Sequence, residues 1–109
     1  MIHFDHIAYS TDDVAGTVEY YQQHFPDTEI LYQDSSWALV LSAGLKIAFV
    51  SPDEHPPHIA FRVDNQQELQ DEATRNNATI KVHRDRSESF YMTDPSGNAV
   101  EFVFYPESQ

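Results

Sequence analysis

Two histidines in matching sequence contexts are the side chains in this chain best suited to chemistry. His6 begins the run His-Ile-Ala-Tyr and His58 begins the run His-Ile-Ala-Phe, so both halves of the chain open in the same way. Each half also closes on an apolar run, and only the second run contains a carboxylate, Glu101, where the first has Ala48. The repeat predicts one structural unit used twice. His6, His58 and Glu101 are therefore the candidates for a shared site.

Two imidazoles and one carboxylate form a donor set that suits Fe, Mn, Ni or Zn as divalent ions and leaves positions open for substrate and water. The chain has no cysteine, so thiolate metal sites and disulfides are excluded. The three residues lie far apart in the sequence, so only the fold can bring them together. The alternative is that His6 and His58 are half-buried strand histidines that bond to the backbone or to carboxylates such as Glu101.

The composition is typical of one soluble domain. The chain has 109 residues, 40% of them hydrophobic, which is enough for a modest core. Its net charge of −12 would repel nucleic acid and anionic membrane surfaces. The first residues run directly into a strand pattern with no basic segment before it, and no apolar run is long enough to span a bilayer. We therefore expect a cytoplasmic protein that binds neither nucleic acid nor membranes.

The first half predicts a strand, a helix and three more strands. Residues 10–13, Ser-Thr-Asp-Asp, suit the start of a helix, and Pro26 ends it. Apolar residues spaced by four, three and four place one stripe along this helix. The predicted elements are a strand over 2–10, a helix over 14–25, and strands over 29–33, 37–41 and 46–50.

The second half repeats this order. A proline-containing connector, residues 51–57, separates the halves, and the Asp-Pro-Ser-Gly-Asn sequence at 94–98 predicts a tight hairpin turn. The predicted elements are a strand over 58–63, a helix over 66–75, and strands over 79–83, 89–93 and 99–105. The sequence thus predicts a single domain, 1–109, with unit one at about 1–53 and unit two at about 54–109.

Strand alternation determines which side chains share a face. His58, Ala60 and Arg62 lie on one face of their strand, and Glu101 and Tyr105 lie on one face of the last strand. We expect the opposite, apolar faces to pack on the helices. The predicted fold is therefore α+β: two tandem βαβββ units form a half-open, cupped mixed β-barrel with the helices outside. The histidines and the glutamate would line its concave side.

These features resemble the vicinal oxygen chelate superfamily, which includes glyoxalase I, extradiol dioxygenases, and fosfomycin and bleomycin resistance proteins. The resemblance covers the whole chain. It rests on the paired units, on the His-Ile-Ala-Phe opening of the second unit, and on the Asp-Pro-Ser-Gly-Asn-Ala-Val-Glu-Phe segment at 94–102. In metal-using members the ligands come from the first and last strands of each unit. The resemblance therefore implies a divalent metal held by His6, His58 and Glu101.

The fourth ligand position separates the chemistries of the family. Ala48 stands there and cannot coordinate a metal or act as a base, so lactoylglutathione lyase chemistry is disfavoured. Two histidines and one glutamate match the set used by fosfomycin resistance transferases and extradiol dioxygenases. The resemblance implies a metal-dependent dioxygenase-like, transferase-like or lyase-like enzyme acting on a small oxygen-rich substrate that chelates the metal. The alternative is a metal-free small-molecule binding or resistance protein, and a purely structural module would leave the repeated histidine unexplained.

Several further residues are candidates for substrate contact. Arg62 could hold a carboxylate or phosphate, or it could form a salt bridge with one of the eighteen acidic residues. Tyr105 and Tyr91 could donate a proton or line the site, although aromatic residues in strands usually pack. Trp37 is predicted to lie in the core. We also expect a homodimer, because a half-open barrel exposes sheet edges, and the site could lie within one chain or between two.

Overall fold

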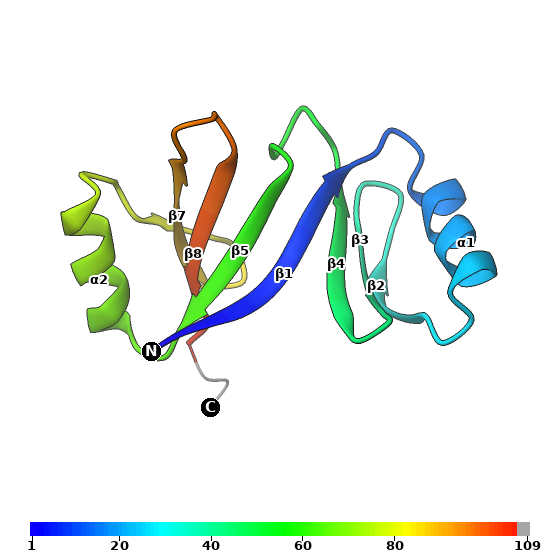
Figure 1. Cartoon of the computed structure of the whole chain (residues 1–109), viewed down its shortest axis with the longest axis horizontal. Helices are drawn as coiled ribbons and strands as arrows, with labels where there is room; N and C mark the ends of the chain where they lie inside the picture. Colours follow the sequence, from blue (N-terminus) through cyan, green and yellow to red (C-terminus); the bar gives the residue numbers. More distant parts are fainter. Residues whose placement is uncertain (107–109) are drawn as a thin grey trace. The chain divides into compact units, whose positions relative to one another are not determined.

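The computed structural model describes residues 1–106 and contains eight strands and two helices in that range. Their order along the chain repeats a strand, a helix and three strands. The elements are β1 (Ile2–Ser10), α1 (Val14–His24), β2 (Glu29–Gln33), β3 (Ala38–Ser42), β4 (Leu45–Val50), β5 (His58–Val63), α2 (Gln66–Arg75), β6 (Lys81–Val82), β7 (Glu88–Thr93) and β8 (Ala99–Phe104) (Figure 1). The predicted α+β class with two βαβββ units is confirmed.

The strands belong to one mixed sheet in the order β2-β3-β4-β1-β5-β8-β7-β6. The order begins at β2 and ends at β6, so these two strands are the edges of an open sheet. The chain divides into two compact units. We call His6–His58 the N-terminal unit, and residues 1–5 together with the chain from Ile59 onward the C-terminal unit. Both divisions fall inside strands, in β1 and at the start of β5.

In the N-terminal unit, α1 covers one face of β2, β3 and β4 (Figure 1). The helix begins where the side chain of Asp13 accepts a hydrogen bond from the Gly16 backbone N–H at 3.0 Å. It ends at His24, two residues before Pro26, which cannot continue it. Its buried face packs on the strands, in a core of Val14, Val18, Ala38, Val40, Ile47 and Phe49. Burying each Val or Phe side chain contributes about 1.5–3 kcal/mol, so this cluster holds the unit together.

The opposite face of this unit carries a second, smaller apolar cluster. β1 pairs in parallel with β4, which places Ala8 opposite Ala48, and β3 places Leu39 opposite Ala48 on the other side. Together with Val50 these side chains form a buried group in which Leu39 is partly exposed. The face of β1 that bears His6 therefore also bears Ala8, a member of this apolar group.

In the C-terminal unit, α2 packs against β8 (Figure 1). The Asn65 side chain caps the helix by accepting from the Glu68 N–H at 2.8 Å, and Glu68 in turn accepts from the Asp64 N–H at 3.1 Å. This reciprocal pair satisfies two backbone donors at the helix start. The core of the unit consists of Val63, Leu69, Ala73, Phe90 and Phe102. Glu101 and Val103 lie on the other face of β8 by alternation.

The turn before β8 fixes where Glu101 falls. The Asp94 side chain accepts from the backbone N–H groups of Ser96 and Asn98, both at 2.9 Å, and Gly97 adopts a φ of 90°. Only glycine takes this left-handed conformation without strain. Hydrogen bonds from Asn98, first of all, hold the pKa of Asp94 below its usual range. The register that follows pairs Tyr91 with Glu101.

The structure differs from the sequence prediction at Trp37 and at several element ends, most of them by one residue. The helix predicted to end at residue 25 ends at His24. The strand predicted over 79–83 spans only Lys81–Val82, and Ile80 before it packs against the core of the C-terminal unit. The prediction that Trp37 lies in the core is wrong. It is 38% exposed and stacks on Tyr32 with ring centroids 4.5 Å apart. Neither helix in residues 1–106 is long and apolar enough to cross a membrane.

Candidate metal centre

His58 is held at the end of the connector that joins the two sequence repeats. Its Nδ1 lies 2.7 Å from the backbone carbonyl oxygen of Pro56, and it is only 8% exposed. A carbonyl oxygen only accepts hydrogen bonds, so Nδ1 carries the proton in this contact. The neutral ring then has its lone pair on Nε2, which is the arrangement found in metal-ligating histidines. A hydrogen bond to the backbone is also what the alternative predicts, in which His58 is a half-buried strand histidine and not a metal ligand.

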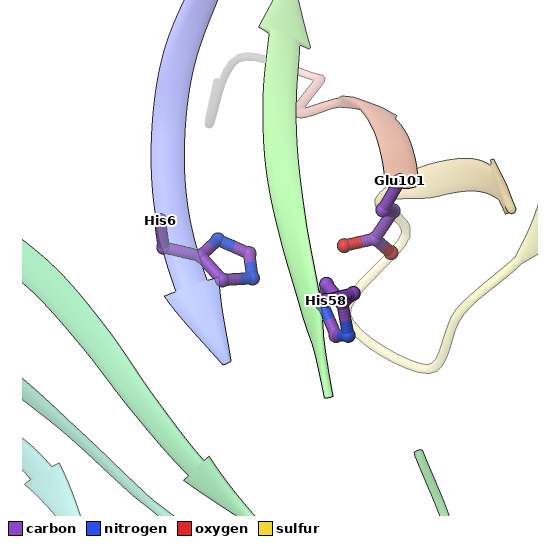
Figure 2. Close-up of side chains that lie close together, drawn as sticks. All are labelled: His6, His58 and Glu101. Carbon is purple, nitrogen blue, oxygen red and sulfur yellow. The ribbon is translucent and has the colours of Figure 1, made fainter. Parts of the chain in front are cut away.

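His6 lies beside His58 within the N-terminal unit. The two rings meet edge to face, with centroids 5.5 Å apart and an interplanar angle of 72°. Figure 2 shows these two rings and the Glu101 carboxylate on three different strands. One ligand atom from each of the three side chains lies within 4.8 Å of the other two. Within residues 1–106 no other group of three histidines or carboxylates comes together in this way.

Glu101 and Ala48 occupy matching positions in the two hairpins but have opposite surroundings. Glu101 is 7% exposed and pairs across the strands with Tyr91, whereas Ala48 pairs with Leu39. Burial, and secondly the charge of Glu101, raise the pKa of the Tyr91 phenol above its usual range. The C-terminal unit therefore has a carboxylate at this position, and the N-terminal unit has no polar side chain at the equivalent position.

The two predicted substrate-binding residues, Arg62 and Tyr105, meet at a residue that the sequence analysis did not single out. Asp5 is 6% exposed, and its Oδ2 accepts a hydrogen bond from the Tyr105 hydroxyl at 2.8 Å. Its Oδ1 lies 3.8 Å from Nη1 of Arg62, so the salt-bridge alternative for this arginine has its partner. The available signal for Asp5 was a carboxylate in the middle of a predicted strand, next to His6.

The tyrosines Tyr91 and Tyr105 should be the last of the six to ionise. Burial raises the pKa of both, and for Tyr105 the next cause is Asp5. A raised folded-state pKa gives stability that is present below about pH 10, the unfolded value, and lost as the pH rises further. We expect Tyr91→Phe and Tyr105→Phe each to remove amplitude from the latest part of an ultraviolet titration of phenolate. The urea-unfolded chain is the control, and loss of amplitude near pH 10 in a variant would contradict the assignment.

A pocket elsewhere in the N-terminal unit includes none of the candidate site residues described above. It has a volume of about 530 Å³ and is lined by Asp12, Asp13, Val14, Ala15, Gln33, Asp34 and Ser35. Asp13 already caps α1, and Asp34 accepts hydrogen bonds from Ser36, Trp37 and Tyr32. The Tyr32 hydroxyl, first of all, holds the pKa of Asp34 below its usual range. The carboxylates of Asp13 and Asp34 therefore stabilise the local backbone conformation.

The sequence matches the family model of the Glyoxalase/Bleomycin resistance protein/Dioxygenase superfamily over residues 3–102. The chain therefore belongs to this superfamily, as the resemblance of its motifs predicts. A search of curated protein sequences found no match.

Solved structures of this fold include proteins with different activities. Methylmalonyl-CoA epimerase from Mycobacterium tuberculosis has a TM-score of 0.73 at 15% identity, over 96% of this chain and 89% of that one. The H200Q variant of homoprotocatechuate 2,3-dioxygenase from B. fuscum has a TM-score of 0.69 at 15% identity, over 95% of this chain and 34% of that one. A superfamily member from Vibrio splendidus 12B01 has a TM-score of 0.61 at 13% identity, over 96% and 100% of the two chains. Identities this low establish the fold alone.

Proposed function

We propose that this protein is a divalent-metal-dependent enzyme of the vicinal oxygen chelate type. Its substrate would be a small oxygen-rich molecule that chelates the metal through two oxygens. The observation that carries the proposal is the approach of one ligand atom each from His6, His58 and Glu101 to within 4.8 Å of one another. Fe, Mn, Ni and Zn all suit two imidazoles and a carboxylate.

The donor chemistry and spacing fit such an ion after a small closure. Donors bound at about 2.1 Å stand about 3.0–3.4 Å apart in octahedral or tetrahedral geometry. Side-chain rotations would bring these atoms, which lie within 4.8 Å of one another, to that range. The Pro56 carbonyl supports His58 for this role because it fixes the tautomer whose Nε2 accepts. With two imidazoles neutral, one carboxylate leaves a single negative charge for a dication.

A bound dication would act as a Lewis acid that polarises substrate oxygens. The protein's own groups would then orient the substrate and hold protons. Tyr91 is placed for this because it pairs with Glu101, and a phenol is protonated at neutral pH. We propose that Tyr91 donates a hydrogen bond to a substrate oxygen, and that Arg62 binds the remainder of the substrate while Tyr105 orients Arg62 through Asp5.

The surroundings of Ala48 favour some reactions over others. Its cluster partners Ala8, Leu39 and Val50 are apolar, so none of them supplies a base in place of the missing side chain. Lactoylglutathione lyase chemistry, which moves a proton next to a carbonyl, is therefore disfavoured. Dioxygenase-like or transferase-like chemistry, in which three protein ligands leave open metal positions, fits the donor set better. The second candidate, a metal-free small-molecule binder, predicts a different metal content.

Metal content distinguishes the two candidates. Wild-type protein purified without a histidine tag should carry, or take up after anaerobic loading, about one divalent ion per chain. Inductively coupled plasma mass spectrometry gives the stoichiometry for each of Fe, Mn, Ni and Zn. If none of the four binds in stoichiometric amount, the enzyme proposal fails and the metal-free binder takes its place.

We further propose that the protein is a homodimer. β2 is a sheet edge, and all five of its residues are exposed. Three of them, Ile30, Leu31 and Tyr32, are large hydrophobic residues with at least 40% exposure. An exposed apolar edge strand tends to pair with another chain unless it is covered. A two-fold partner would cover both edges at once.

A further inference from the structure

Asp5, Arg62 and Tyr105 form a polar cluster within the C-terminal unit. Asp5 is buried, and it receives the Tyr105 hydroxyl on Oδ2 at 2.8 Å. Arg62 approaches the other oxygen, Oδ1, but its nearest nitrogen stays 3.8 Å away. The arginine and the tyrosine thus share one carboxylate unequally.

The long separation from Asp5 leaves the N–H donors of the Arg62 guanidinium available to a ligand. A charge-assisted hydrogen bond spans about 2.7–2.9 Å, so the 3.8 Å separation is an ion pair without a hydrogen bond. The strong fork-to-fork pairing of arginine with a carboxylate needs both carboxylate oxygens. Tyr105 already donates to Oδ2, so a fork-to-fork pairing of Arg62 would have to share that oxygen with the phenol. The phenol remains a donor over a wide pH range because burial raises its pKa.

Arg62 is also the kind of residue that an anionic ligand would need in this protein. Its side chain is 39% exposed, and Asp5 is its ion-pair partner in the described part of the chain. Eighteen acidic residues against six basic ones create a field that repels anions. An anion would therefore bind only where a guanidinium offers several donors at close range.

We propose that Arg62 binds an oxyanion group of the substrate, a carboxylate or a phosphate, and that Tyr105 is a positioning residue that stops Arg62 from closing onto Asp5. The proposal rests on the proposed function in that the same substrate would chelate the metal. It names a substrate class: small molecules that carry an anionic group in addition to the chelating oxygens. Tyr105 acts through Asp5 and touches no substrate.

The test uses metal-free protein, so that it does not depend on the metal proposal. Nuclear magnetic resonance of the ¹⁵N-labelled full chain follows the Nε–H signals of its arginines, and Arg62→Lys assigns the signal of Arg62. The probes are benzoate and phenyl phosphate, with benzamide as the neutral control. We expect a saturable shift of the Arg62 signal with one or both anions and none with benzamide. Arg84 and Arg86, both exposed, are internal controls for nonspecific binding.

A double-substitution cycle tests the role of Tyr105. Tyr105→Phe should weaken anion binding by at least about threefold, because without the competing phenol donor Arg62 pairs more closely with the Asp5 carboxylate. In the Asp5→Asn background the same substitution should change the affinity by less than about 1.5-fold, since the charged partner is gone. Tyr20→Phe removes an exposed hydroxyl in the other unit and should have no effect.

Each outcome decides one part of the proposal. An Arg62 shift no larger than those of Arg84 and Arg86, or an equal response to benzamide, would overturn the anion site. An equal effect of Tyr105→Phe in both backgrounds would overturn the positioning role. Anion binding at Arg62 in a protein that takes up no metal would leave this inference standing while the proposed function fails. Stoichiometric metal binding without anion binding at Arg62 would support the proposed function and overturn this inference.

Discussion

Glu101→Ala protein should retain less than about a tenth of a metal ion per chain under conditions that load the wild type with about one. The carboxylate supplies one of three donors and the only negative charge among them, so two imidazoles would remain. His58→Ala should lose the metal equally, because the imidazole held by the Pro56 carbonyl goes with it. Mass spectrometric metal analysis after gel filtration measures both losses.

Two control substitutions each remove a carboxylate or an imidazole that is not among the proposed metal ligands. Glu88→Ala removes a carboxylate from the same hairpin, where it accepts from the Gln66 amide at 2.9 and 3.0 Å. His24→Ala removes an imidazole that stacks on Tyr20 in α1. Both proteins should keep wild-type metal content, and circular dichroism should show that all four variants are folded. Wild-type metal content in Glu101→Ala would remove this residue from the ligand set.

Mixing His6→Ala protein with Glu101→Ala protein should restore no metal binding. Each variant lacks one donor, and within one chain the ligand atoms of His6, His58 and Glu101 lie within 4.8 Å of one another. Subunits of a homodimer would then each keep a defective site after exchange. The two variants are unfolded together in urea, refolded with metal and analysed for metal content.

The same experiment reports on the assembly. Light scattering should give twice the chain mass of 12.5 kDa for the wild type and for the mixture. Half of the dimers in a randomly refolded mixture are heterodimers, and an exchanged heterodimer has one complete site. If the mixture recovers about one metal ion per four chains, His6 of one chain completes the site of another, and an intrachain site is wrong. A monomer at micromolar concentration would remove the dimer proposal and leave the metal proposal intact.

The sequence predicted the elements that carry the metal candidates because each depends on local chemistry. Strand alternation placed Glu101 on the face opposite Phe102, and the core of the C-terminal unit contains Phe102 but not Glu101. The Asp-Pro-Ser-Gly-Asn turn set the register of β8 through hydrogen bonds within five residues. Pro26 limited α1 to within one residue of the predicted end.

The errors and omissions concern contacts between distant parts of the sequence. Asp5 meets Tyr105 a full chain length away, and no local pattern distinguishes that contact from an ordinary strand carboxylate. Trp37 was assigned to the core because aromatic residues in strands usually pack. Alternation does not reveal that the neighbouring strand β2 is an edge with every residue exposed, so Trp37 stacks on Tyr32 at the surface.

The boundary of the compact units falls between Asp5 and His6, whereas the sequence repeat starts at the first residues of the chain. Residues 1–5 belong to the C-terminal unit, and the connector before Ile59, the corresponding stretch of the second repeat, belongs to the N-terminal unit. Each repeat therefore contributes its opening residues to the unit that consists mainly of the other repeat. In a shorter ancestor with only one repeat, the opening segment would have had no second unit to join within its own chain, and two copies could have completed each other by exchanging these segments. Joining two copies in one gene would have made that exchange permanent and freed each half to diverge, one toward Glu101 and the other toward Ala48.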